Sequence, residues 1–292
     1  MVKLEFSIEL NYKINDDKSD FIFNIHAANT PKQSIISEKL ELSQDVETRI
    51  HVDSSTGSRF AHLSAGKGDL KVKYNCLLNI NPTLENPNHI RESSILNLPG
   101  HVLKYIYPSR YCQSDRLHKF AFREFGHIPM GYNRVLKIKE WVINHVTFTP
   151  STSNWNTSAL DTLVDRVGVC RDFTHLMIAL CRAVNIPARF TTGIDYGADP
   201  IWGPTDFHAY VEVFLDGRWY IFNPSNIGIP MGFVRMGVGR DAADVSFATI
   251  FGAVKASVPL VDIKAFSDYN NILPYECNEA ISTDDESVQC FS

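Results

Sequence analysis

The stretch from residue 166 to residue 223 constrains the fold most strongly in this chain of 292 residues. After Gly168, apolar residues follow the i, i+3, i+4, i+7 spacing of a helix that faces a core. These residues are Phe173, Leu176, Met177, Leu180, Cys181 and Val184. Gly168 lets the chain turn tightly before the helix, and Cys170 continues the apolar stripe into the first helical turn. The sequence therefore predicts an inward-facing thiol at a helix start.

A β-hairpin is predicted further along the chain. The pair Asp216-Gly217 lies between two runs of alternating apolar and polar residues, which is a strong signal for a two-residue turn. With that turn Tyr210 opposes Asn223, so His208 and Asn223 lie on one face as diagonal neighbours. Such neighbours are about 7–8 Å apart at the backbone, within reach of an imidazole and an amide. A register shifted by one residue would place the two side chains on opposite faces.

Cysteine, histidine and asparagine can serve as a nucleophile, a base and a group that orients the base. At a helix start the unpaired amides and the dipole favour an anion, so we expect a lowered pKa for the Cys170 thiol. Each residue also has a structural interpretation, because an isolated cysteine is commonly a small buried hydrophobe and an isolated polar residue at a strand end is commonly satisfied locally. The helix start, the hairpin register and the chain order agree, and together they favour catalysis by Cys170, His208 and Asn223.

The same stretch resembles a known family. Its segments G-V-C-R-D-F-T-H-L and C-R-A-V-N-I-P-A-R are similar to the nucleophile helix of the transglutaminase-like superfamily, in its bacterial cysteine-protease-like branch. The motif P-S-R-Y-C-Q-S-D-R-L at 108–117 resembles the junction after that branch's N-terminal domain. The motif G-R-D-A-A-D-V at 239–245 resembles a stretch after its last catalytic residue. The resemblance covers most of the chain.

This resemblance implies a papain-like Cys-His-Asp core. In it Cys170 is the nucleophile, His208 is the general base and then the acid, and residue 223 orients the imidazole. The chain departs from the family at Asn223, where the family usually has Asp. An Asn carbonyl can accept the imidazole N–H and fix its tautomer, as in papain-like proteases. It cannot stabilise the imidazolium as a carboxylate would.

Patterns and resemblance together predict an α+β protein. A transglutaminase-like core, with a helix packed on an antiparallel sheet, follows an N-terminal antiparallel β-sandwich-like domain. Alternating apolar residues from Val2 to Ile14 and strand patterns at 21–27 and 69–78 indicate the sheet-rich first domain. We assign this domain to residues 1–118 with a connecting region to about 130, the catalytic domain to 131–266, and a partly disordered acidic tail to 267–292.

Charge and motifs limit the partners and cofactors. The net charge is −5 and no basic run is present, which argues against a nucleic-acid partner or an anionic membrane. Metal-ligand spacing, a Gly-rich phosphate loop and an HExxH motif are absent from the sequence, so we expect no metal and no cofactor. Six cysteines without regular spacing and no export signal indicate free thiols in a reducing compartment. We therefore expect a cytoplasmic protein.

The resulting hypothesis is acyl transfer through a thioester on Cys170, with a peptide or protein amide as substrate. The sequence leaves the acceptor open, so a protease or amidase competes with a transglutaminase. We favour hydrolysis because water needs no binding site. Transfer to a small amine, as in arylamine N-acetyltransferases, and a non-enzymatic scaffold in which Asn223 marks decayed catalysis are the alternatives. Trp155 and Trp202 lie in loops beside these residues, where each either binds substrate or packs.

Overall fold

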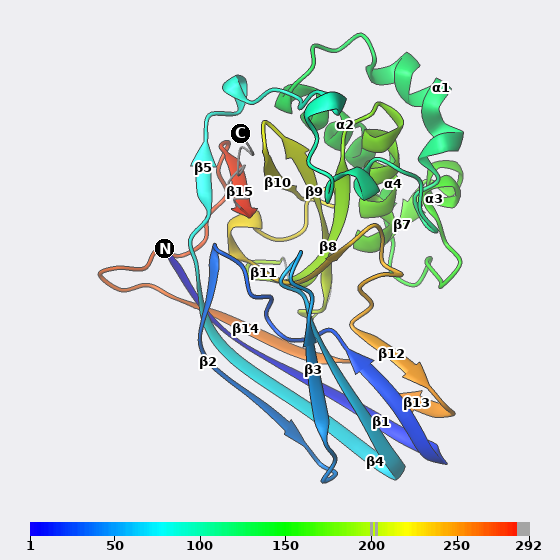
Figure 1. The fold of residues 1–292 in the computed structure, drawn as a ribbon, viewed down its shortest axis with the longest axis vertical. Coiled ribbons are helices and arrows are strands. Elements are labelled where there is room, and N and C mark those ends of the chain that lie inside the picture. The colour runs from blue at the N-terminus through cyan, green and yellow to red at the C-terminus, as the bar shows by residue number, and fades with distance from the viewer. Residues whose placement is uncertain (199–200, 202–203, 285–292) are drawn as a thin grey trace.

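The computed structural model of the protein describes residues 1–198, 201 and 204–284. It contains two large antiparallel sheets, and helices cover one of them (Figure 1). The N-terminal sheet, blue and cyan in Figure 1, lies below the green and yellow part of the chain that carries the helices. One apolar core joins the inner faces of both sheets, and a second core lies between the other sheet face and the helices.

The N-terminal sheet is built around two long strands. β1 (Val2–Phe23) and β4 (Arg59–Ile80) pair antiparallel along almost their whole length. The even-numbered positions of β1 are buried from position 2 to position 14, which confirms the half-buried strand predicted from the alternating pattern. The far edge of β4 pairs with β2 (Gln33–Leu42) and β3 (Thr48–Val52).

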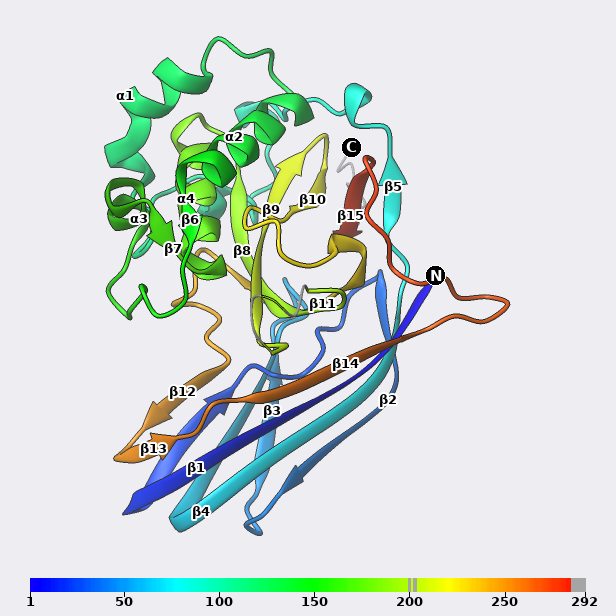
Figure 2. The same ribbon diagram turned by 180° about the vertical axis from the view of Figure 1, so that it is seen from behind.

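The other edge of β1 is filled by strands from late in the chain. β12 (Ala248–Phe251), β13 (Val254–Ala256) and β14 (Leu260–Phe266) pair antiparallel with successive parts of β1 (Figure 2). The sequence analysis placed these strands with the second domain, because a strand pattern does not reveal which sheet the strand joins. In the structure they belong to the sheet of the first domain.

The second sheet has the strand order β11-β8-β9-β10-β15-β5 and is antiparallel. Helices α1 to α4 pack on its outer face, away from the N-terminal sheet (Figure 2). The predicted α+β class, with a helix packed on an antiparallel sheet, is therefore confirmed. The bounds are β5 (Thr83–Glu85), β8 (Ala188–Asp195), β9 (His208–Leu215), β10 (Arg218–Phe222), β11 (Phe233–Gly239), β15 (Ala280–Asp284), α1 (Ser114–Phe125), α2 (Tyr132–His145), α3 (Ala159–Asp165) and α4 (Cys170–Ala183).

Short elements connect these layers. The chain between the two sheets packs against the second sheet, where the rings of Tyr105 and Trp219 meet edge to face with centroids 5.3 Å apart. In the described part of the chain, no helix is long and apolar enough to cross a membrane. The short elements are η1 (Pro87–His89), η2 (Ile95–Asn97), η3 (Leu103–Tyr105), η5 (Pro230–Gly232) and the parallel pair β6 (Thr147–Phe148) and β7 (Val167–Gly168).

The hairpin of β9 and β10 has the predicted register. Leu215 pairs with Arg218, and the pairing continues in step along both strands. Asp216 and Gly217 have φ values of 48° and 82°, the left-handed values that a two-residue turn of this kind requires. The pairing ends with Phe222 opposite Val211, so Asn223 lies directly after β10.

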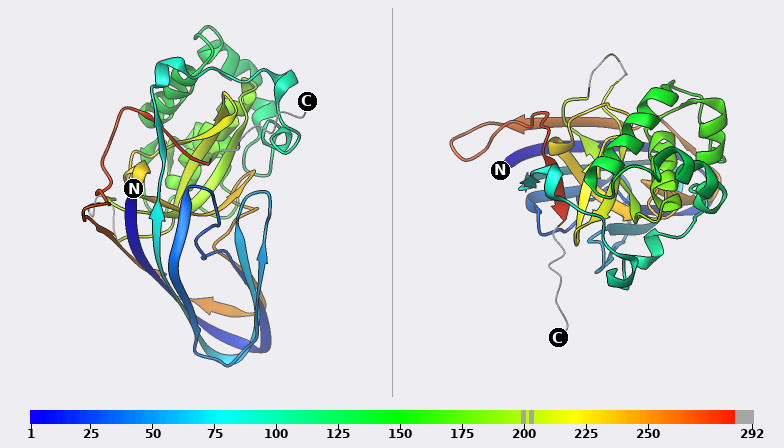
Figure 3. Two further views of the ribbon diagram at one scale, coloured as in Figure 1. Left: turned by 60° about the vertical axis from the view of Figure 1, so that its left-hand side comes forward. Right: turned by 90° about the horizontal axis from the view of Figure 1, so that it is seen from above.

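The two faces of this hairpin meet different cores. On β9, Ala209, Val211 and Val213 join the core under the helices, whereas Tyr210 joins the core between the two sheets. Because side chains alternate along a strand, His208 lies on the face of Tyr210. The imidazole thus starts β9 on the sheet face opposite the helices. Figure 3 shows the helices, in green, packed beside the yellow-green strands of this sheet.

The predicted acidic tail is partly ordered. Residues 280–284 form β15, which pairs with β10 and β5 inside the second sheet. The prediction of a partly disordered tail did not identify this strand, because its order comes from backbone pairing with two neighbouring strands and not from its own composition. Residues 285–292 lie outside the described part of the chain.

Candidate active site

The start of α4 is fixed by the carboxylate of Asp172, which lies in the first turn of the helix. Its Oδ2 accepts a hydrogen bond from the Val169 amide at 2.9 Å, and its Oδ1 accepts one from Ser153 Oγ at 2.9 Å. A Cβ at position 168 would lie 2.7 Å from the Asp172 Cβ, so only glycine fits there. Gly168 therefore permits the close approach of the cap, whereas the sequence analysis assigned it to a tight turn.

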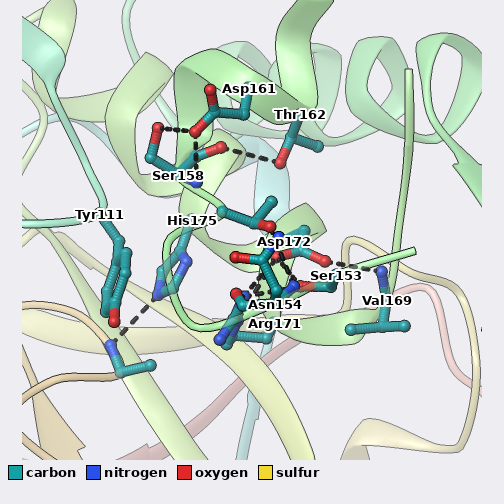
Figure 4. A network of polar contacts seen from close by, with 12 residues as sticks. Tyr111, Ser153, Asn154, Ser158, Asp161, Thr162, Val169, Arg171, Asp172 and His175 are labelled. Atoms are coloured by element: carbon teal, nitrogen blue, oxygen red, sulfur yellow. Dashed lines mark hydrogen bonds and ion pairs between the residues drawn. The ribbon is translucent and has the colours of Figure 1, made fainter. Parts of the chain in front are cut away.

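Arg171 ties this helix start to the loop that carries Trp155. Its guanidinium donates to Ser153 Oγ and to the Asn154 carbonyl, both at 2.6 Å (Figure 4). The Tyr111 hydroxyl donates to the Trp155 carbonyl at 2.7 Å. The loop backbone is thus held from two sides, while the indole of Trp155 stays 74% exposed at the edge of the site.

A cavity of about 340 Å³ opens beside the α4 start. Cys170 and His208 both line it, so the structure brings the predicted nucleophile and base into one cavity. Most of the remaining lining is apolar or aromatic, and the rings of Phe207 and Phe247 stack with centroids 4.5 Å apart. The apolar lining includes Tyr111, Trp155, Phe190, Phe207, Val245 and Phe247.

Burial governs the protonation of the thiol. Burial first, and then the negative charges of Asp195, Asp206 and Asp172, raise the pKa of Cys170 to about 12. The amide of Ala209, which hydrogen-bonds to the sulfur, opposes them. The predicted lowering of this pKa is therefore wrong for the structure, because desolvation and a carboxylate in the first helical turn outweigh the helix dipole.

Each ring nitrogen of His208 has a polar neighbour. Its Nε2 lies 3.2 Å from Ser225 Oγ, and its Nδ1 lies 3.5 Å from Asp195 Oδ2. Burial lowers the pKa of His208, whereas the charges of Asp195 and Asp206 raise it. The buried imidazole thus remains neutral until a proton is delivered within the cavity.

Asn223 reaches the imidazole through Ser225. Its Oδ1 accepts hydrogen bonds from the Ser225 amide at 3.2 Å and from the Ser225 hydroxyl at 2.9 Å. Its Nδ2 donates to the carbonyls of Ile227 at 2.6 Å and Gly228 at 3.2 Å. The side chain therefore stabilises the loop after β10, with a serine hydroxyl between it and His208.

The chain resembles known proteins along nearly its whole length. The family model of the transglutaminase-like superfamily matches residues 121–224, and that of the bacterial transglutaminase N-terminal domain matches residues 2–101. The crystal structure of a protein described as a "putative cysteine protease" from Cytophaga hutchinsonii has a TM-score of 0.88 and 35% sequence identity, over 96% of this chain and 97% of that one. The chain belongs to the transglutaminase-like superfamily.

Curated relatives match over shorter stretches. An uncharacterised protein of Mycobacterium leprae is 32% identical over 117 residues, which are 38% of this chain and 42% of the relative. An uncharacterised protein of Mycobacterium tuberculosis is 31% identical over 110 residues, which are 34% of this chain and 35% of the relative. The chain therefore spans less than half the length of these curated relatives.

The transglutaminase-like core contains polar partners of His208 that the sequence analysis missed. Asp195 closes the strand run A-R-F-T-T-G-I-D, and Ser225 follows Asn223 by two residues. A carboxylate at the end of a buried strand was a usable signal, but the loop before His208 hid the alignment of that strand with β9. Trp202 lies outside the described residues. Within the described residues, no three metal-ligating side chains cluster.

Proposed function

We propose that the protein is a thiol-dependent hydrolase that cleaves peptide or amide bonds by acyl transfer to Cys170. The observation that carries the proposal is that Cys170, at the start of α4, and His208, at the start of β9, line one cavity. Membership of the transglutaminase-like superfamily supports the same chemistry. A free nucleophilic thiol needs a reducing compartment, so the proposal places the enzyme in the cytoplasm.

The resting thiol and imidazole are both neutral, because burial raises the pKa of Cys170 and lowers that of His208. When a substrate carbonyl enters, His208 takes the thiol proton while the sulfur attacks the carbonyl carbon. The first amides of a helix have no acceptor within the helix, so the N–H of Cys170 is placed to donate to the oxyanion. In this mechanism Asn223 orients His208 through Ser225.

The acyl-enzyme forms and breaks by proton transfers through His208. The imidazolium of His208 gives its proton to the leaving amine as the C–N bond breaks, which leaves a thioester on Cys170. Water then attacks the thioester, His208 takes the water proton and returns it to the sulfur, and the free acid leaves. No oxidant or cofactor enters this sequence of steps.

The cavity lining favours an apolar acyl group. Phe190, Phe207 and Phe247 present aromatic surface beside the sulfur, and Val245 adds aliphatic surface. A large apolar side chain at the scissile carbonyl would bury against these residues, and each fully buried side chain of that size contributes about 1.5–3 kcal/mol. A charged side chain would lose its hydration there. Trp155, at the edge of the cavity, would contact the chain on the leaving-group side.

A peptide-amide library with varied acyl residues tests the proposal. We expect release of amine from substrates with large apolar residues. When hydroxylamine is added, it should attack the thioester on Cys170, release the thiol and carry the acyl group away as a free hydroxamate. Cys170→Ala is the matched control and should release nothing. Absence of turnover and of any trapped acyl group across the library would refute the hydrolase.

The same library with an added primary amine separates hydrolysis from transamidation. Water and amine compete for one thioester, so a hydrolase should give mainly free acid at millimolar amine. Amide product in excess of free acid would replace hydrolysis by transamidation. It would leave the role of Cys170 unchanged.

A catalytically silent binding module is the second candidate. The raised pKa of Cys170 and the neutral Asn223 both favour it, because each weakens the nucleophile or its base. In that case the native protein and Cys170→Ala should bind the same apolar peptides with equal affinity. Turnover by the native protein alone would exclude this candidate.

A further inference from the structure

His208 is one member of a closed ring of five polar side chains on the inner face of the second sheet. From Nδ1 the ring passes to Asp195 Oδ2 at 3.5 Å, and the Tyr210 hydroxyl donates to the same oxygen at 2.7 Å. Asn223 Nδ2 lies 3.4 Å from the Tyr210 hydroxyl, and Asn223 Oδ1 accepts from Ser225 Oγ at 2.9 Å. Ser225 Oγ closes the ring at His208 Nε2, 3.2 Å away.

Within this ring, Asp195 is the one carboxylic acid. Burial raises the pKa of Asp195, whereas the positive charge of a protonated His208 and the hydrogen bond from Tyr210 lower it. Tyr210, Asn223 and Ser225 are neutral hydrogen-bonding groups, and Asn223 stands where the family usually has a carboxylate. The Asp195 side chain is 2% exposed, so its charge is shielded from water and has to be balanced by a partner nearby. The imidazole of His208 becomes that partner when it takes the proton of Cys170.

We infer that Asp195 is the positioning residue that holds His208 and stabilises its imidazolium during acyl transfer, in place of a carboxylate at position 223. Its role in the reaction rests on the proposed function, whereas the pairing with His208 does not. Asp206 also raises the pKa of His208, but its Oδ1 accepts a hydrogen bond from the adjacent Phe207 amide at 2.7 Å. Asp206 therefore contributes charge from outside the ring.

The fold reserves space for this carboxylate. Gly228 has a φ of 83°, and a Cβ on it would lie 2.1 Å from Asp195 Oδ2 and 3.1 Å from the Tyr210 hydroxyl. The loop that follows Asn223 thus closes over Asp195 with no side chain between them. A carboxylate enclosed this tightly cannot turn away from the imidazole without moving the loop.

The direction of the electrostatic effect can be stated in advance. A nearby negative charge favours the protonated form of an imidazole and disfavours the thiolate. Removing the charge in Asp195→Asn should therefore lower the pKa of His208 and also lower that of Cys170. If Asp195 served only to fill space, Asn would fill it equally and neither titration would move.

Histidine titration followed by NMR on protein labelled with ¹³C-histidine tests the pairing without any substrate. The His208 signal is identified by its loss in His208→Gln. In Asp195→Asn we expect the His208 midpoint to move to lower pH or to leave the accessible range, with a smaller movement in the control Asp206→Asn. Asp195→Asn/Asn223→Asp, which moves the carboxylate across the ring, should restore part of the original midpoint.

Activity on a cleaved library substrate tests the catalytic role. We expect kcat/KM to fall about 100-fold in Asp195→Asn, with both limbs of its pH profile displaced to lower pH, and to recover in the double variant. The inference would be overturned, even in an active enzyme, if the midpoint of the His208 titration did not move in Asp195→Asn. It would also be overturned if that midpoint moved equally in Asp206→Asn. A protein without turnover whose His208 still depends on Asp195 would instead refute the proposed hydrolase and keep the pairing.

Discussion

The helix half and the sheet half of the candidate site are held in place by different kinds of structure. At the helix half, one buried carboxylate caps α4, and Arg171 fastens the neighbouring loop to it. At the sheet half, His208 belongs to a closed ring in which each side chain contacts two others. Loss of a helix cap disturbs the helix start alone, whereas loss of one ring member removes a contact from each of its two neighbours. The two halves should therefore respond differently to substitution.

The largest effect is expected from removing the sulfur. Cys170→Ala should lower kcat/KM for a cleaved substrate by at least about 10³-fold, because no other group forms the thioester. The His208 titration should keep its shape, since the ring does not include the thiol. Cys277→Ala, at a partly exposed cysteine, is the control and should retain full activity. Residual turnover in Cys170→Ala would assign the nucleophile to another residue.

Alkylation of Cys170 as a function of pH tests whether the thiol of the helix half is neutral at rest. With a pKa of about 12, the thiolate fraction rises about tenfold for each pH unit below that value. The rate of reaction with iodoacetamide, located by peptide mapping, should thus rise about 10³-fold between pH 7 and pH 10. A rate that is already high and level below pH 7 would mean a preformed thiolate–imidazolium pair and contradict the neutral resting state.

Removing the cap tests whether the helix half fails locally. Asp172→Ala should lower the free energy of unfolding by about 1–3 kcal/mol, because the Val169 amide and Ser153 hydroxyl lose a buried acceptor. Urea unfolding measures this loss, and Asp161→Ala, which removes the more exposed cap of α3, should cost less. The His208 titration should stay unchanged. A shifted midpoint of the His208 titration in Asp172→Ala would show instead that the two halves of the site are coupled.

The smallest effect is expected at the cavity wall. Phe247→Ala removes the ring that stacks on Phe207. This variant should lower kcat/KM about tenfold for substrates with large apolar acyl residues, and it should leave kcat/KM for glycyl substrates nearly unaffected. Phe251→Ala, on the same C-terminal stretch but 57% exposed, is the control. Equal losses for large and small acyl residues would place the acyl group elsewhere.

Local patterns predicted individual strands and the residue pairs within the β9–β10 hairpin. The even-numbered burial of β1 follows from alternation, and the pairing of Leu215 with Arg218 follows from the Asp-Gly turn. The same patterns did not show that residues 248–266 return to β1, or that residues 280–284 join β10. A strand's sequence specifies which of its faces is buried, but its choice of neighbour depends on the whole fold.

The candidate site was predictable to the same extent. Cys170 and His208 were found because a helix start and a strand start mark their positions. Asp195 was missed because its contact with His208 depends on how β8 aligns with β9 across a long loop. The direction of the Cys170 pKa was predicted wrongly, because desolvation depends on what covers the helix start, which sequence spacing does not reveal.

The return of β12 to β14 to the edge of β1 has a consequence for synthesis of the protein. A ribosome completes β1 long before it releases residues 248–266, so one edge of the first sheet stays unpaired while most of the chain emerges. An open edge of this length is a template for pairing with other chains. Premature termination anywhere before residue 248 would leave that edge permanently exposed, and the truncated products should aggregate. Only chains that extend through β14 can pair the full length of that edge.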